Sequence, residues 1–515
     1  MTSHAENTKR IAKNTLMLYV RMLFSMLVSL YTSRVVLNTL GVEDYGIYNV
    51  VGGVIGLLGF LTTSLGAATS RYLTFDLGKG DLVALKKTFG NVLGIYLLLS
   101  LVIFIVGETI GLWFMTTQLQ IPVERQYAAL WAYQFSIFST IVGIICSPYI
   151  SVIIAHEKMS VFAYISIADV VLRLLMVYLL VVIPYDKIIT YVILLFIVQI
   201  FDVLVYGIYS VRHFEESRVN ISYDKKLFKE ILVYSGWIMN GHLAIIGYTQ
   251  GLNILLNMFF GPVVNAARGI AVTVNNVCSS FCSNFQMACN PQLTKSYAQG
   301  DLVYMQSLLI RSSKFSFYIL FFFMLPLMFE ATPVLKIWLG IVPEYTVVFL
   351  RLILCISLMG TLSNPVIAAV HATGNLKRFQ LIEGTILLLI VPVAYILLKF
   401  FHVPPFSVFI VHLCVELCAQ FARLKIVLPL INMNLTIYYN QVIVPLLKVV
   451  ILSPILPFCL YCFMNEGLLR FFVVCVACVI SCSFFVYSLG CSLKEREFIS
   501  LKTVSVLRGM GFNRN

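Results

Sequence analysis

Long apolar runs recur along the whole chain and are separated by short polar connections. A run of about 20 residues is long enough for a helix to cross the roughly 30 Å hydrocarbon core of a bilayer. Because hydrocarbon offers the backbone no hydrogen-bond partners, we expect each run to be an α-helix, and the predicted fold class is an all-α polytopic membrane protein. Fourteen spans are predicted, near 14–36, 46–70, 90–113, 127–154, 160–183, 188–210, 231–258, 267–289, 314–332, 345–370, 379–400, 405–422, 441–463 and 468–490.

The eighth run is more polar than the others. Its sequence, "RGIAVTVNNVCSSFCSNFQMACN", contains several Asn and Ser residues, among them Asn275. Such side chains are costly in lipid, so we expect this helix to turn them toward protein or water.

A short polar phrase occurs twice, as "GKGDLV" from Gly78 and as "AQGDLV" from Ala298. The same offset of 220 residues pairs other positions, and an offset of 217 aligns "SPYISVIIA" at Pro148 with "NPVIAAVHA" at Pro365. These pairs keep their order and fall at matching span boundaries, which indicates a duplicated unit of six spans. Six is even, so the two copies are predicted to be parallel repeats related by an axis along the membrane normal. The last two spans lie outside the duplication.

The repeat predicts how the chain is divided. We expect an N-terminal six-helix lobe over 1–210, a cytoplasmic linker over 211–230 and a C-terminal six-helix lobe over 231–428. Two additional transmembrane helices follow over 429–490, and 491–515 is predicted to be a cytoplasmic tail.

Composition and charge agree with a membrane protein. Of the 515 residues 60% are hydrophobic and 11% charged, and the mean hydropathy is +0.93, which excludes an ordinary soluble globule. Most of the 36 Lys and Arg residues fall in the N-terminal tail, in every second connection and in the C-terminal tail. Positive residues stay in the cytoplasm, so both termini are predicted to be cytoplasmic. The net charge of +13 is assigned to loops facing anionic headgroups and not to nucleic-acid binding.

Motifs for catalysis or cofactor binding were sought and not found in the sequence. The 13 cysteines mostly lie inside spans, as in "CVACVISC", without zinc-ligand spacing. The glycines of "VGGVIGLLGF" fit close helix packing better than a phosphate loop, and no hydrolytic triad is evident. We therefore expect a protein that is not an enzyme and that has no cofactor and no metal.

Polar and ionisable residues inside spans are the candidates for function, because lipid penalises them. In the first span Arg21 and Ser25 share one helix face, and Arg21 has no obvious acidic partner in its own helix. Arg21 is therefore the main candidate for a cation that binds an anion. For Arg268, extension to the lipid headgroups is an equally good explanation. The predicted substrate-binding residues are Arg21, Ser25, Arg268, Asn253, Asn275 and Arg351.

The acidic residues inside spans have two explanations. Asp169 lies four residues before Arg173, so an ion pair within the helix is favoured over ligand binding. Asp202 and Glu416 are buried by position and could relay protons or bind a cation, although pairing with arginines explains them equally well. Ion coupling and a structural role both stay open for these residues.

Two stretches carry a family resemblance. "NTLMLYVRMLFSMLVSLYTSRVVLNTLGVEDYGIYNVVGGV", with its "LGVEDYGIYNV" turn after the first span, is followed by "SRYLTFDLGKGDLVALKKTFGNVLGIYLLL". They resemble the start of bacterial polysaccharide transporters, the O-antigen and capsule repeat-unit flippases. That superfamily also holds the lipid II flippase and the multidrug and toxin extrusion antiporters.

The resemblance implies a function. It implies an inner-membrane transporter that flips a polyprenyl-pyrophosphate-linked oligosaccharide by alternating access, with membrane lipids, polysaccharide polymerase and chain-length proteins as further partners. It also implies anion-binding arginines on the first and eighth helices, which Arg21 and Arg268 match by helix. The alternative is a drug or cation antiporter of the extrusion class, which would favour acidic and aromatic sites. A polymerase or ligase is disfavoured because no large periplasmic loop is visible.

Overall fold

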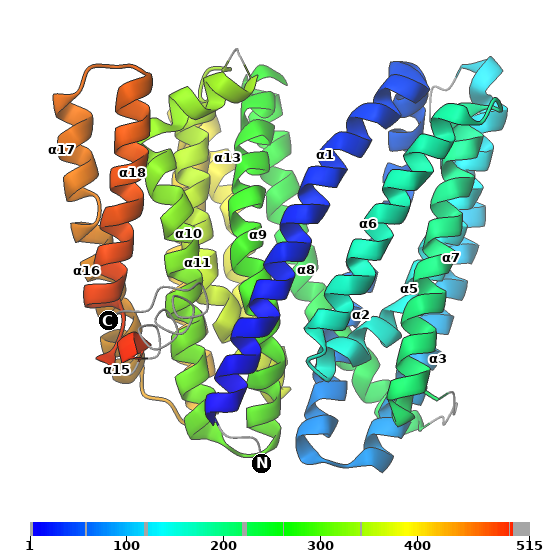
Figure 1. Cartoon of the computed structure of the whole chain (residues 1–515), viewed down its shortest axis with the longest axis horizontal. Coiled ribbons are helices and arrows are strands. Elements are labelled where there is room, and N and C mark those ends of the chain that lie inside the picture. The colour runs from blue at the N-terminus through cyan, green and yellow to red at the C-terminus, as the bar shows by residue number, and fades with distance from the viewer. Residues whose placement is uncertain are drawn as a thin grey trace, which may run out of the picture. The chain divides into compact units, whose positions relative to one another are not determined.

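The computed structural model describes residues 4–56, 59–117, 122–218, 224–260, 262–339, 342–493 and 495–497. Within these ranges every regular element is helical, which confirms the predicted all-α fold class. The main helices, shown in Figure 1, are α1 (His4–Gly56), α2 (Gly59–Lys79), α3 (Leu82–Val106), α4 (Leu112–Thr117), α5 (Gln126–Ala155), α6 (Met159–Val182), α7 (Lys187–His213), α8 (Lys225–Phe260), α9 (Pro262–Ala298), α10 (Leu302–Leu339), α11 (Thr346–Thr373), α12 (Lys377–Leu388), α13 (Ile390–Phe401), α14 (Ser407–Leu430), α15 (Leu435–Tyr438), α16 (Val444–Leu452), α17 (Ile455–Phe463) and α18 (Leu468–Phe485).

Twelve helical segments in the described part of the chain are long and apolar enough to cross a membrane. The chain is therefore a multi-pass membrane protein. The predicted span near 267–289 is helical and lies in α9. The described residues of the span near 46–70 are also helical and belong to the end of α1 and to α2, and α2 and α9 are less apolar than the other twelve. For α9 this agrees with its Asn and Ser content.

The backbone departs from the predicted boundaries in two ways. The segment "LGVEDYGIYNV" was expected to form a turn, yet α1 continues through it. Its two glycines each cost a helix only about 1 kcal/mol, and it contains no proline to end the helix. The predicted span near 379–400 is instead divided at Leu389 into α12 and α13, because Pro392 cannot donate a backbone hydrogen bond and its ring crowds the carbonyl four residues earlier.

The chain packs as two compact units, and each combines several segments. Unit 1 consists of Met1–Leu243, Met287–Asp301 and His371–Gln380. In it α5 packs against α7, α2 and α3, around buried side chains such as Tyr133 and Phe89. Unit 1 thus holds the first repeat together with three short parts of the second: the first half of α8, the end of α9 and the turn between α11 and α12.

Unit 2 consists of Ala244–Gln286, Leu302–Val370 and Leu381–Asn515. Here α10 packs against α18, α17 against α18 and α13 against α14. The last two predicted spans correspond to the helices from α15 to α18 and belong to this unit. The lobe boundaries predicted from the sequence stay a prediction. The two compact units are defined by how the helices pack, whereas the predicted lobes are defined by the repeat in the sequence.

The backbone repeats at the positions that the sequence paired. Gly80 and Gly300 have φ angles of 73° and 74°, a left-handed conformation that suits glycine and ends α2 and α9. Asp81 then accepts hydrogen bonds from the amides of Val83 and Ala84 and caps the start of α3. The shared Gly-Asp pair is therefore a helix stop followed by a helix start in both places.

Candidate functional site

In unit 1 the predicted acidic residues lie together with an arginine. Arg173 on α6 donates from Nε to both carboxylate oxygens of Asp169, at 2.8 and 3.0 Å. This confirms the predicted ion pair within one helix. Asp202 on α7 is buried and interacts with both residues of the pair. Two carboxylates and one guanidinium thus form a small charged cluster between α6 and α7.

Arg21 on α1 belongs to the same unit. It is half-buried, and its guanidinium carbon lies 4.9 Å from the centre of the Phe162 ring on α6. A cation over an aromatic face is attracted by the ring quadrupole, which helps to hold the guanidinium in place. Ser25, one turn further along α1, is also half-buried.

In unit 2 the structure brings two predicted residues into contact. Arg268 on α9 donates from Nη1 to Oδ1 of Asn253 and from Nη2 to the backbone oxygen of Thr249, both at 3.1 Å. Both acceptors are neutral groups of α8. The buried Nε of Arg268 has no hydrogen-bond partner in the part of the chain that the structure describes. Within the described ranges no carboxylate pairs with Arg268, and one of its donors is unused.

Asn275 and Arg351 lie elsewhere in unit 2. Asn275, two turns after Arg268 on α9, accepts a long hydrogen bond of 3.5 Å from the Ser279 hydroxyl. Arg351 lies near the start of α11, half-buried, and its Nε also has no hydrogen-bond partner among the described residues. Neither residue hydrogen-bonds to the Arg268 and Asn253 pair within the described ranges.

Glu416 belongs to a buried ion network. Arg423, on the same helix α14, donates from Nη1 to Glu416 and from Nε to Glu383 of α12, both at 2.6 Å. The same Nη1 lies 2.7 Å from the hydroxyl of Ser363 on α11. Arg423 lies one residue beyond the predicted span 405–422 and is not among the predicted site residues. A signal was available, since Glu416 and Arg423 are seven residues apart and so share a helix face.

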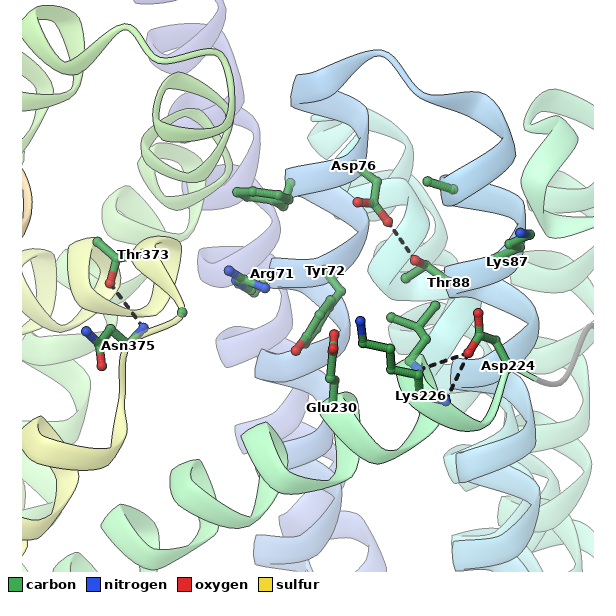
Figure 2. Close-up of a pocket in the computed structure, with 14 residues that line it drawn as sticks. Arg71, Tyr72, Asp76, Lys87, Thr88, Asp224, Lys226, Glu230, Thr373 and Asn375 are labelled. Atoms are coloured by element: carbon green, nitrogen blue, oxygen red, sulfur yellow. Dashed lines mark hydrogen bonds between the residues drawn. The ribbon is translucent and has the colours of Figure 1, made fainter.

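One end of unit 1 contains a polar cavity of about 690 Å³ that the sequence analysis did not predict. It is lined by Arg71 and Tyr72 of α2, Glu230 of α8 and the α11–α12 turn (Figure 2). Figure 2 shows Arg71 between α2 and the turn that carries Thr373 and Asn375.

Asp76 also lines this cavity. Burial raises the pKa of Asp76, and the hydrogen bond that it accepts from the Thr88 hydroxyl, at 2.6 Å, partly opposes the shift. Among the described residues no cluster of His, Cys, Asp or Glu could hold a metal ion.

The comparisons with known proteins concern the family and the fold. Residues 11–300, more than half of the chain, match the family model described as polysaccharide biosynthesis protein. No curated protein shows significant sequence similarity to the chain.

Solved structures show the fold. A MATE transporter in complex with MaD3S has a TM-score of 0.71 at 14% identity, covering 83% of this chain and 96% of that one. An outward-facing multidrug resistance MATE transporter of the MOP superfamily has a TM-score of 0.70 at 15% identity, with the same coverage. A MOP superfamily transporter from Pyrococcus furiosus, described as having a binding pocket of reverse polarity, has a TM-score of 0.68 at 14% identity, also over 83% and 96%.

Proposed function

The chain belongs to the polysaccharide biosynthesis protein family, and from this premise we propose that it flips a polyprenyl-pyrophosphate-linked oligosaccharide across the bacterial inner membrane. The proposed direction is from the cytoplasmic to the periplasmic leaflet, by alternating access, with both termini in the cytoplasm. The fold supports this, since the solved structures that it resembles are transporters.

The observation that carries the proposal is the environment of Arg268. Its hydrogen bonds go to an amide and a backbone carbonyl, and no carboxylate pairs with it in the part of the chain that the structure describes. A guanidinium without a carboxylate partner attracts a pyrophosphate, which is anionic. Arginine can form bidentate, charge-assisted hydrogen bonds with phosphate oxygens. The proposed substrate site therefore includes Arg268 and Asn253.

Residues in unit 1 fit the same role. Arg21 lies against an aromatic ring, so a second guanidinium is present in the other repeat. Ser25, Asn275 and Arg351 are proposed as further contacts, because hydroxyl, amide and guanidinium groups suit sugar hydroxyls and phosphate oxygens. We propose Asp169, Arg173 and Asp202 as a coupling or structural cluster, and Glu416 as a structural residue held by Arg423.

The experiment is complementation in a strain from which the gene is deleted. Arg268→Glu and Arg21→Glu should each abolish surface polysaccharide, because a carboxylate repels the pyrophosphate, and lipid-linked oligosaccharide should accumulate in the inner membrane. Arg212→Glu, an exposed site at the end of α7, is the matched control and should export normally. Normal export by both Arg268→Glu and Arg21→Glu, at equal protein levels, would remove the proposed site.

Export of cationic drugs is the second candidate, because two of the similar structures are titled as MATE or multidrug resistance transporters. The carboxylates Glu383 and Glu416 argue against it, since Arg423 already neutralises them in part. The same strains distinguish the two. Efflux of a cationic dye that depends on Asp202, with polysaccharide unchanged, would favour drug export.

A further inference from the structure

The ends of α2 and α9 meet at positions that the repeat makes equivalent. A Cβ built on Gly78 would lie 2.7 Å from the Cβ of Ala298 and 3.1 Å from the backbone oxygen of Lys295, so the contact requires glycine. Gly78 and Ala298 begin the two copies of the repeated phrase. The two copies of the phrase are therefore in contact with each other inside unit 1.

On one side of this contact α2 of the first repeat is tied to the second repeat. Arg71 donates from Nε to the backbone oxygen of His371, at 3.2 Å, and from Nη2 to that of Ala372, at 3.4 Å. The Tyr234 hydroxyl donates to the same His371 oxygen, at 3.0 Å. These carbonyls end α11, where helix oxygens lack intrahelical partners and carry partial negative charge, so a guanidinium suits them. We call this the Arg71 tie.

On the other side α9 of the second repeat is tied to the first. Glu157, in the turn between α5 and α6, is 3% exposed. Its carboxylate accepts hydrogen bonds from Lys295 Nζ at 2.9 Å and from Gln292 Nε2 at 2.5 Å, both on α9. Arg10 Nε of α1 lies 2.9 Å from the same carboxylate. We call this the Glu157 tie.

The two ties occupy equivalent places. The offset of 217 that pairs Pro148 with Pro365 also pairs Glu157 with Gly374. Both have left-handed backbone, with φ of 58° and 78°. Each tie therefore joins α2 or α9 to the equivalent turn of the opposite repeat, and the Gly78–Ala298 contact links the two helices that carry the ties.

The two ties use different side chains at equivalent positions. They are therefore not simply an unchanged contact that the duplication copied. Glycine suits the left-handed position at 374, where an added Cβ would meet the Arg71 guanidinium at 2.6 Å. A glutamate in that conformation is strained, because a side chain disfavours the left-handed region. In this strained conformation Glu157 places its buried carboxylate against α9.

We propose that the Arg71 tie and the Glu157 tie are two halves of one lock that holds the repeats together at this end of the protein. The role of the lock rests on the proposed function, because alternating access requires this end of the protein to open. Both ties break when it opens. Because α2 and α9, which carry the ties, are in contact at Gly78 and Ala298, the opening that breaks one tie also strains the other. The ties are therefore coupled, and loosening one loosens the other.

Coupling can be tested without substrate, by hydrogen–deuterium exchange of the purified full chain in detergent. Arg71→Lys keeps the charge but loses the paired donors, and Glu157→Gln keeps an acceptor but loses the charge. Arg71→Lys should raise exchange in peptides from 287–301, the α9 end that it does not touch, and Glu157→Gln should raise it in peptides from 371–380. We expect roughly tenfold faster exchange at the distant tie, from the loss of one charged hydrogen bond. Arg212→Lys is the exposed control and should change neither peptide.

The outcomes separate a lock from two local contacts. Faster exchange confined to the peptide beside each substitution overturns the proposal. Arg71→Ala and Glu157→Ala check the same reciprocity more strongly. If a variant exchanges faster everywhere, it has lost its fold, and its conservative partner decides the question. Reciprocal coupling together with normal export by the Arg268→Glu and Arg21→Glu strains would keep the lock and reject the substrate assignment.

Discussion

Arg268 and Arg423 bring the same guanidinium into unit 2, but the groups around the two side chains differ in charge. Arg423 is 3% exposed and binds two carboxylates and a hydroxyl, from three different helices. Arg268 is half-buried and binds an amide and a backbone carbonyl. The charge of Arg423 is therefore compensated inside the protein, whereas in the proposed site the charge of Arg268 binds an anion. On this proposal the partners of a cation, more than its burial, separate a structural role from a binding role.

The comparison also has an energetic side. Removing one member of a buried ion network leaves an uncompensated charge, which typically costs about 3–5 kcal/mol. Neutral acceptors such as Asn253 do not need the charge of their donor, so the loss of Arg268 removes only two hydrogen bonds. Substitution of Arg423 should therefore lower stability strongly. Substitution of Arg268 should lower stability little and impair function.

The largest expected effect on stability comes from Arg423→Met. It leaves Glu383 and Glu416 facing each other without a cation and should lower the free energy of unfolding by about 3–5 kcal/mol. Thermal or denaturant unfolding in detergent measures this. The control is Lys86→Met, which breaks the exposed Lys86–Glu215 pair and should leave the unfolding midpoint unchanged. Equal midpoints for the Arg423→Met and Lys86→Met variants would show that the network is not structural.

A smaller effect is expected for Arg268→Gln. Glutamine keeps a donor for Asn253 and loses the charge, so the free energy of unfolding should fall by no more than about 1 kcal/mol. The same unfolding measurement applies. A loss as large as that of Arg423→Met would show that Arg268 is a structural cation, and the contrast between the two arginines would disappear.

Local features of the fold could be predicted from the sequence. Each apolar run predicts a helix by itself. The Gly-Asp pairs at Gly80 and Gly300 predict the end of one helix and the start of the next, because this turn depends on only a few neighbouring residues. The pair of Asp169 and Arg173 was predictable for the same reason. The helix through "LGVEDYGIYNV" was not, because two glycines without a proline do not decide between a turn and a helix.

Contacts between distant segments could not be predicted. Arg71 meets carbonyls 300 residues further along the chain, and nothing near Arg71 in the sequence indicates them. Glu157 depends on α9 in the same way. Arg268 and Asn253 were proposed separately, from the polarity of two helices, and only packing shows that they touch. Which helix faces meet is decided by the tertiary structure.

The central claim is that the positive charge of Arg268 binds a pyrophosphate. The most direct measurement is native mass spectrometry of the purified protein with a polyprenyl pyrophosphate and with the matching uncharged polyprenol. The wild-type protein should retain the pyrophosphate lipid at least roughly tenfold better than the polyprenol, and Arg268→Gln should lose most of this preference. Equal retention of both lipids by the wild-type protein, or an unchanged preference in Arg268→Gln, would contradict the claim.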